Sequence, residues 1–117
     1  MRILTIKPLS PPVAETISGD LKSMQAVVGG SIQAIYPFEE PVALICHEEG
    51  KLIGLPLNRA LRHPATGEIY DVIAGTFFLC AAPPDADDFV GLSDAQIAAY
   101  TAKFSRPEIY LEGEDND

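Results

Sequence analysis

The chain has 117 residues, the length of one ordinary domain, and 47% of them are hydrophobic, which is enough for a core without disulfides or metals. Its 8 lysines and arginines face 17 aspartates and glutamates, and the net charge of -9 argues against direct binding to nucleic acid or to an anionic membrane. No apolar run approaches the roughly 20 residues of a membrane span, and the first residues do not resemble a signal peptide, so we expect a cytoplasmic protein.

The first third of the chain predicts a strand, a helix and a second strand. Residues 2–7 alternate between apolar and polar and are rich in Ile, Leu and Thr, which is typical of a strand. Asp20 is a good N-cap, and Gly29 supplies a stop, so we expect a helix over Leu21–Val28. Residues 31–36 alternate again and predict the second strand.

The middle of the chain predicts a β-hairpin. Val42–His47 is a strand, residues 48–50 form a polar turn that ends in glycine, and residues 51–55 return as the partner strand. The following segment, residues 55–67, is punctuated by prolines and reads as a loop or a short helical turn. The apolar run 73–82 then predicts a central buried strand.

A helix with a clear start occupies the last third. Ser93 and Gln96 have the spacing of a capping box, in which each side chain bonds the backbone of the other. Ile97, Tyr100 and Phe104 follow at helical spacing and predict the stripe that faces the core.

These elements predict an α+β fold, a mostly antiparallel sheet with two helices packed on it. We expect one domain over residues 1–111 and an acidic, frayed tail over residues 112–117.

The most unusual segment for function is the basic stretch 55–67, which contains no acid in an otherwise acidic chain. It carries Arg59, Arg62 and His63, preceded by Asn58. A guanidinium donates paired hydrogen bonds to phosphate or carboxylate, and an amide can read a base or ribose edge, so these residues are candidates for ligand binding. The alternative is structural: the arginines pair with the acidic surplus, or Asn58 caps a turn.

A second candidate is the pair Gly75 and Thr76, whose backbone N–H groups and hydroxyl can bind an anion. The alternative there is a bulge at the start of a strand. A bound base would also need an aromatic wall. The candidates for that wall are Tyr70, Tyr36 and one of Phe77 and Phe78, which point to opposite faces of their strand.

The cysteines and histidines do not predict a metal site or a catalytic centre. Cys46, His47, His63 and Cys80 match no zinc spacing, and neighbours on a strand point to opposite faces. Both cysteines lie in apolar runs, where a free thiol is a small buried hydrophobe in a reducing compartment. With no evident pair of nucleophile and base, we expect no enzyme and no cofactor.

Residues 42–61 and 69–78, together with the Gly29-Gly30 join, resemble an uncharacterised family of small proteins, domain of unknown function 3846. The resemblance spans most of the chain. It implies an origin in bacteriophages, plasmids and conjugative elements, and hence a bacterial host cell, but it implies no activity and no catalytic residues.

Two functions follow as expectations. In the first, a non-enzymatic accessory protein binds and sequesters a phosphorylated small molecule, such as a cyclic nucleotide that signals in host defence, at the interface of a homo-oligomer. In the second, an acidic interaction protein or nucleic-acid mimic inhibits a host protein. The basic segment favours the first function and the acidic C-terminal third favours the second.

Overall fold

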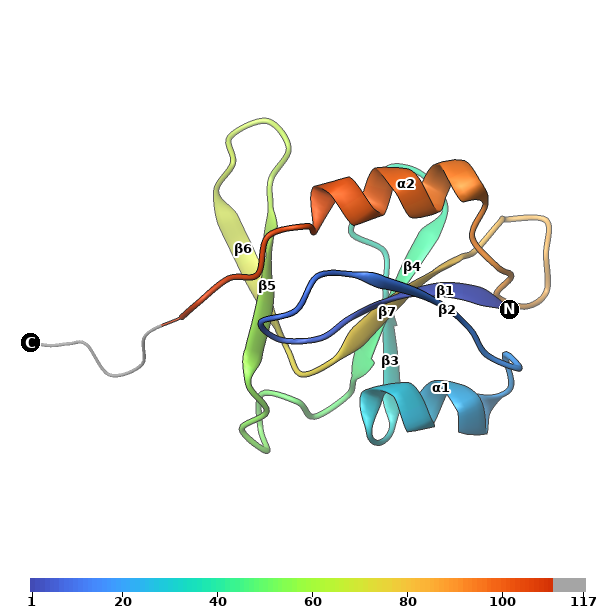
Figure 1. The fold of residues 1–117 in the computed structure, drawn as a ribbon, viewed down its shortest axis with the longest axis horizontal. Coiled ribbons are helices and arrows are strands. Elements are labelled where there is room, and N and C mark those ends of the chain that lie inside the picture. The colour runs from blue at the N-terminus through green and yellow to red at the C-terminus, as the bar shows by residue number, and fades with distance from the viewer. Residues whose placement is uncertain (111–117) are drawn as a thin grey trace, which may run out of the picture.

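A computed structural model describes residues 1–110, so the predicted tail over residues 112–117 lies outside the described residues. The described chain forms two helices and seven strands (Figure 1). Their bounds are β1 Arg2–Ile6, β2 Val13–Thr16, α1 Leu21–Val28, β3 Ile32–Ile35, β4 Val42–His47, β5 Leu57–Arg62, β6 Ile69–Ala74, β7 Phe77–Ala81 and α2 Asp94–Lys103.

The larger sheet has five strands in the order β2-β1-β7-β4-β3, and every neighbouring pair is antiparallel. The strands β5 and β6 form a separate antiparallel pair at one end of this sheet, with α1 and α2 on opposite sides of the larger sheet (Figure 1). The predicted α+β class, a mostly antiparallel sheet with two helices, is confirmed.

Helix α1 begins and ends at the predicted residues. The Asp20 carboxylate accepts the Ser23 N–H at 2.8 Å, which satisfies one free donor of the first turn. Gly29 has a φ of 85° and donates its N–H to the carbonyl of Gln25, which ends the helix. Met24 and Val28 pack against one face of the large sheet.

Helix α2 and the β5–β6 pair cover the opposite face of the large sheet. Tyr100 and Phe104 from α2 and its C-cap share a cluster with Leu61 of β5 and with Phe77 of β7. Phe78, the next residue of β7, lies in the other cluster, beneath α1. The two phenylalanines therefore point to opposite faces, as alternation along a strand predicts.

The predicted hairpin between Val42–His47 and residues 51–55 is wrong. Strand β4 pairs with β3 on one edge and with β7 on the other, so no edge of β4 is left for residues 51–55. Those residues form turns, in which Leu52 is 85% exposed and Ile53 is 58% exposed. Leu52 and Ile53 therefore lie outside the core, whereas Leu55 is half-buried against Gly75.

The basic segment 55–67 is also not the predicted loop, because residues 57–62 form the strand β5. Likewise, the predicted strand 73–82 is two strands of different sheets, β6 and β7. The break falls at Gly75, whose φ of 83° is readily adopted only by glycine and turns the chain from one sheet to the other. The short edge strand β2 was not predicted.

The predicted capping box at the start of α2 is confirmed. The Gln96 N–H donates to Ser93 Oγ at 3.1 Å, and the Ser93 N–H donates to Gln96 Oε1 at 2.9 Å. Both bonds satisfy backbone donors that the first turn of a helix leaves without a partner.

We expect Ser93→Ala to lower the free energy of unfolding by about 1 kcal/mol, because the variant loses the acceptor for the Gln96 N–H. Urea unfolding followed by circular dichroism measures the change. Ser105→Ala is the matched control, since Ser105 is exposed just beyond α2. Equal unfolding midpoints for both variants would show that the cap does not stabilise the helix.

Candidate functional site

Arg59, the first of the predicted ligand-binding residues, is fully buried between the two sheets. Its Nε and Nη2 donate to the carbonyl of Phe104 at 3.2 and 3.0 Å. Nη2 also donates to the carbonyl of Ser10 at 2.6 Å, and Nη1 donates to Asn58 Oδ1 at 3.0 Å. The guanidinium thus links β5 to the end of α2 and to the turn after β1.

Asn58 is fully buried beside it and extends the same network. Its Nδ2 donates to the carbonyl of Ile6 at 2.9 Å and to the carbonyl of Gly75 at 2.9 Å. The first bond reaches the end of β1, and the second reaches the corner between β6 and β7. One amide therefore ties the two sheets together where the chain crosses between them.

The buried charge of Arg59 is compensated mainly by dipoles. Burial lowers the pKa of the Arg59 guanidinium, and the nearby Glu108 carboxylate opposes that shift. Phe104 is the C-cap of α2, so its carbonyl lies at the negative end of the helix dipole, where a cation is stabilised. Arg59 and Asn58 leave no exposed surface for a ligand. Their role in this fold is structural, but it differs from the predicted alternative, because Arg59 bonds carbonyls and not acidic side chains, and Asn58 joins the two sheets and does not cap a turn.

The second candidate pair lies in the corner between the sheets and not in a cavity. The Gly75 N–H is buried and donates to the carbonyl of Pro56 at 2.7 Å, so it is not free to bind an anion. A Cβ at Gly75 would lie only 2.7 Å from Leu55 Cδ1, so the close packing at this position favours glycine. Thr76 follows it, half-buried. Phe78 is fully buried beneath α1 and cannot line a ligand site.

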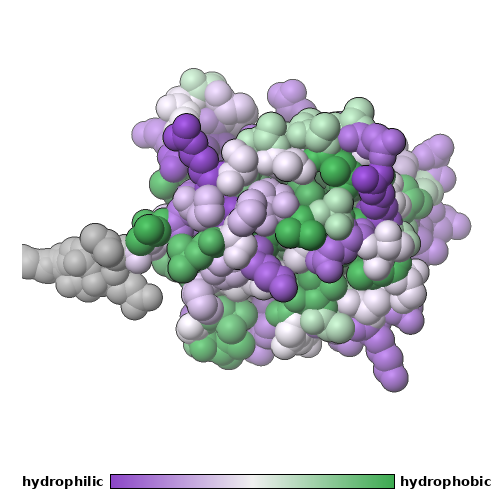
Figure 2. Space-filling model, in the orientation of Figure 1, coloured by the Kyte–Doolittle hydropathy of each residue, from purple (hydrophilic) through white to green (hydrophobic). Residues whose placement is uncertain are grey.

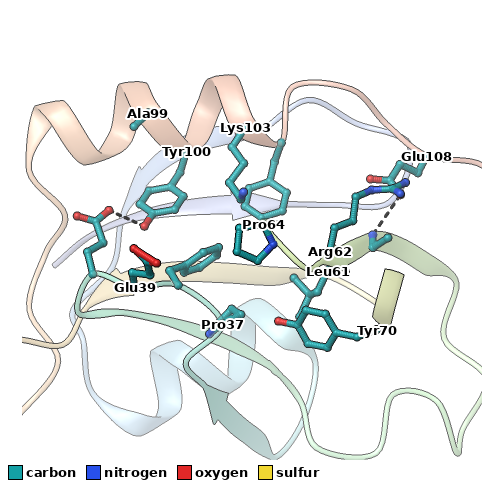
Figure 3. Close-up of a pocket in the computed structure, with 14 residues that line it drawn as sticks. Pro37, Glu39, Leu61, Arg62, Pro64, Tyr70, Ala99, Tyr100, Lys103 and Glu108 are labelled. Carbon is teal, nitrogen blue, oxygen red and sulfur yellow. Dashed lines mark hydrogen bonds between the residues drawn. The ribbon is translucent and has the colours of Figure 1, made fainter. Parts of the chain in front are cut away.

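Two of the predicted residues, Arg62 and Tyr70, do line a cavity. It has a volume of about 560 Å³ and lies between α2, the end of β5, β6 and the loop 37–40 (Figure 3). His63 stacks on Tyr70 with ring centroids 4.8 Å apart, just outside the lining. Tyr36 is exposed and does not line it. On the face seen in Figure 2, apolar and hydrophilic residues are mixed, and apolar residues lie both near the centre and at the lower edge.

Aromatic rings form much of the cavity wall. Phe38 contacts Tyr100 with ring centroids 4.8 Å apart and Phe104 at 6.2 Å, and Tyr70 lines the cavity from β6. The Lys103 ammonium lies 6.0 Å from the centroid of Phe38, within the range of a cation–π contact. The wall offers flat apolar surface with a cation beside it.

The cavity also carries charges of both signs. Arg62 and Lys103 are its cations, and Glu39, Glu40 and Glu108 are its carboxylates. Arg62 is exposed and donates to the carbonyl of Gly67 at 3.3 Å.

Two of these carboxylates are already bonded to the protein. Glu40 accepts the Tyr100 hydroxyl, and Glu108 accepts both the Ala60 N–H, at 3.1 Å, and the Tyr110 hydroxyl. Burial and the bond to Glu40 raise the pKa of Tyr100. Burial and the bond to Glu108 raise the pKa of Tyr110 to about 12.

The sequence reasoning found only two of the fourteen residues that line this cavity, Arg62 and Tyr70. The hydrogen bond between Tyr100 and Glu40 joins residues that are 60 positions apart in the sequence, so no local sequence pattern predicts it. One signal was available, since Phe38, Glu39 and Glu40 stand between two prolines that favour an ordered loop.

The cysteines are buried and free. Burial raises the pKa of the Cys80 thiol to about 12, and it also raises the pKa of Cys46, so neither is poised as a nucleophile. Within residues 1–110, no group of three or more His, Cys, Asp or Glu side chains could hold a metal ion. Neither helix of this region has the length and apolarity needed to cross a membrane.

The comparisons with known proteins give a family for this fold. Residues 1–105 match the family described as a domain of unknown function, DUF3846. The chain belongs to this family. The match confirms the resemblance and covers every residue of the cavity except Glu108, which follows it. No curated protein and no solved structure matches the chain.

We expect Arg59→Ala to destabilise the fold strongly. The change leaves the carbonyls of Phe104 and Ser10 and the side-chain oxygen of Asn58 without this donor. Each buried acceptor without a partner costs about 1–3 kcal/mol, so the expected loss is about 3 kcal/mol or more. Thermal or urea unfolding measures it, with the exposed Arg106→Ala as control. Equal stability of the two variants would contradict the structural role of Arg59.

The half-buried Tyr110, bonded to Glu108, predicts a loss of stability at alkaline pH. The pKa of Tyr110 is raised from 10.0 to about 12 in the fold, so its contribution is complete below about pH 10 and is lost as the pH rises to about 12. Tyr110→Phe should therefore lose less stability over that range than the wild type, measured by urea unfolding. Tyr36→Phe, at an exposed tyrosine, serves as control. A Tyr110→Phe protein that loses as much as the wild type would contradict the assignment.

Proposed function

We propose that this domain binds a singly phosphorylated small molecule with an aromatic group, such as a nucleotide, in the cavity between α2 and the β5–β6 pair. The observation that carries the proposal is the combination of aromatic wall and two cations, Arg62 and Lys103, around one cavity (Figure 3). The binding is sequestration without turnover.

The size and lining of the cavity support a ligand of this class. Small-molecule sites commonly have volumes of about 300–1,000 Å³ and mostly apolar walls with a few polar groups that fix orientation. The volume of about 560 Å³ lies within that range. The exposed Tyr70 and the half-buried Phe38 offer ring faces against which a base can stack, whereas Tyr100 lines the cavity but is only 6% exposed.

The charges of the cavity favour one phosphate over several. Arg62 and Lys103 can each donate charge-assisted bonds to a phosphate group. Three carboxylates line the same cavity, and the whole chain carries a net charge of -9, so a polyphosphate would meet strong repulsion. A ligand with one anionic group and several hydrogen-bond donors satisfies both kinds of side chain.

Sequestration is favoured over catalysis by the residue types present. The described residues that line the cavity include no Ser, Thr, Cys or His that could act as a nucleophile beside the carboxylates of Glu39, Glu40 and Glu108. The family resemblance implies an origin in phages and mobile elements, and by analogy a nucleotide signal of bacterial host defence would be a fitting ligand in the host cytoplasm.

The expected homo-oligomer is not needed to form this site. We expected the ligand at a subunit interface because a domain this small should form only a shallow pocket. The cavity of about 560 Å³ is lined by residues of a single chain, so this argument for an interface site no longer applies. Oligomerisation stays a prediction of its own, which size-exclusion chromatography with light scattering tests.

The acidic interaction protein is the second candidate function. Asp85, Asp87 and Asp88 are exposed on the loop that precedes α2, whereas Asp94 pairs with Arg2. A carboxylate cluster on an exposed loop suits a basic partner surface. The three loop aspartates do not line the cavity, so replacing them with Asn should leave ligand binding unchanged. Loss of inhibition of the host protein in this variant, but not in a variant of the cavity, would favour this second function.

The decisive test is calorimetric titration with linear and cyclic nucleoside monophosphates. We expect binding to the wild type, and a loss of affinity of about tenfold or more in Arg62→Ala and in Lys103→Ala, because each removes a charge-assisted pair. Arg106→Ala, also a loss of one exposed cation, is the matched control. Ligand released by heat should be chemically unchanged. No heat with any nucleotide would contradict the proposal, and an altered ligand would indicate an enzyme.

A further inference from the structure

The cavity has two chemically different ends. Figure 3 shows Glu39 and Tyr100 toward one end, Arg62 and Glu108 toward the other, and Lys103 between them. Arg62 and Glu39 therefore lie at opposite ends of the cavity, with Glu108 beside Arg62 (Figure 3). A ligand with its phosphate near Arg62 would direct its base toward Glu39.

We infer that Glu39 makes this site selective for guanine among the nucleobases, an inference that rests on the proposed function. The Glu39 side chain is exposed at the cavity and forms no hydrogen bond or ion pair within residues 1–110. Both of its oxygens are therefore available. Glu40, its neighbour, already accepts the Tyr100 hydroxyl.

Base recognition by a carboxylate follows from its hydrogen-bonding capacity. An ionised carboxylate only accepts, and its two oxygens can accept two parallel bonds. Guanine presents two adjacent donors, the N1–H and the 2-amino group, on one edge. Adenine places an acceptor beside its amino group, and uracil places a carbonyl on each side of its single N–H, so both would bring an acceptor against Glu39.

The surroundings of Glu39 suit a stacked base. Phe38 and Tyr100 form a tilted pair 4.8 Å apart at the same end, and Lys103 lies over the Phe38 ring. A base stacked on Phe38 would lie beside Glu39, the next residue of the loop 37–40. The Lys103 ammonium can then reach the sugar or the phosphate.

The test compares guanosine, inosine, adenosine and uridine monophosphates by calorimetric titration. We expect guanosine monophosphate to bind tightest and inosine monophosphate, which lacks the 2-amino group, to bind about tenfold more weakly. Glu39→Gln should lose about tenfold or more for the guanine ligand and little for the uracil ligand. Glu15→Gln, on the exposed strand β2, should keep the wild-type order.

The outcomes separate the two proposals. Equal binding of all four nucleotides by the wild type, or an undiminished guanine preference in Glu39→Gln, overturns the role of Glu39 and leaves the nucleotide site standing. Failure of the wild type to bind any of the four overturns the proposed function itself, and the base selectivity with it.

Discussion

The Arg59 guanidinium, buried between the two sheets, is the constraint on which the rest of the structure depends. It donates hydrogen bonds to the carbonyls of Phe104 and Ser10 and to the side-chain oxygen of Asn58. Asn58 in turn donates to the carbonyl of Ile6, at the end of β1, and to the carbonyl of Gly75, between β6 and β7. A desolvated cation needs these bonded carbonyls in addition to the nearby Glu108 carboxylate, so the small sheet, α2 and the turn after β1 must meet at this point. Leu9 in that turn has a φ of 62°, which costs about 1 kcal/mol for a residue with a side chain.

The position of the candidate site depends on the same hydrogen bonds of Arg59 and Asn58. By fixing the end of α2 against β5, the Arg59 network sets the distance across which the cavity opens, and Glu108 closes its far end by accepting the Ala60 N–H. The residues that we propose contact the ligand are outside this hydrogen-bond network. Arg62 lies just past the buried part of β5, and Glu39 lies in a loop that contributes Phe38 to the wall.

The sequence predicted what local interactions determine. The caps of both helices depend on residues within one turn, and both were confirmed at Asp20 and Ser93. Strand β5 was not predicted, because its polar residues enter the core only through partners far along the chain: 45 residues separate Arg59 from Phe104. Of the residues predicted to bind a ligand, the exposed Arg62 and Tyr70 line the cavity. Arg59 was predicted to be accessible because of its charge, but it is fully buried.

The most direct test of this account is a titration of the nitrogen-labelled protein with guanosine monophosphate, followed by two-dimensional NMR of the backbone amides. The account predicts that amides of the loop 37–40, of the end of β5 and of the last turn of α2 move together, with one shared dissociation constant, while the loop that carries Asp85 to Asp88 stays unchanged. Shifts centred on any other surface, or none at saturating nucleotide, would contradict it.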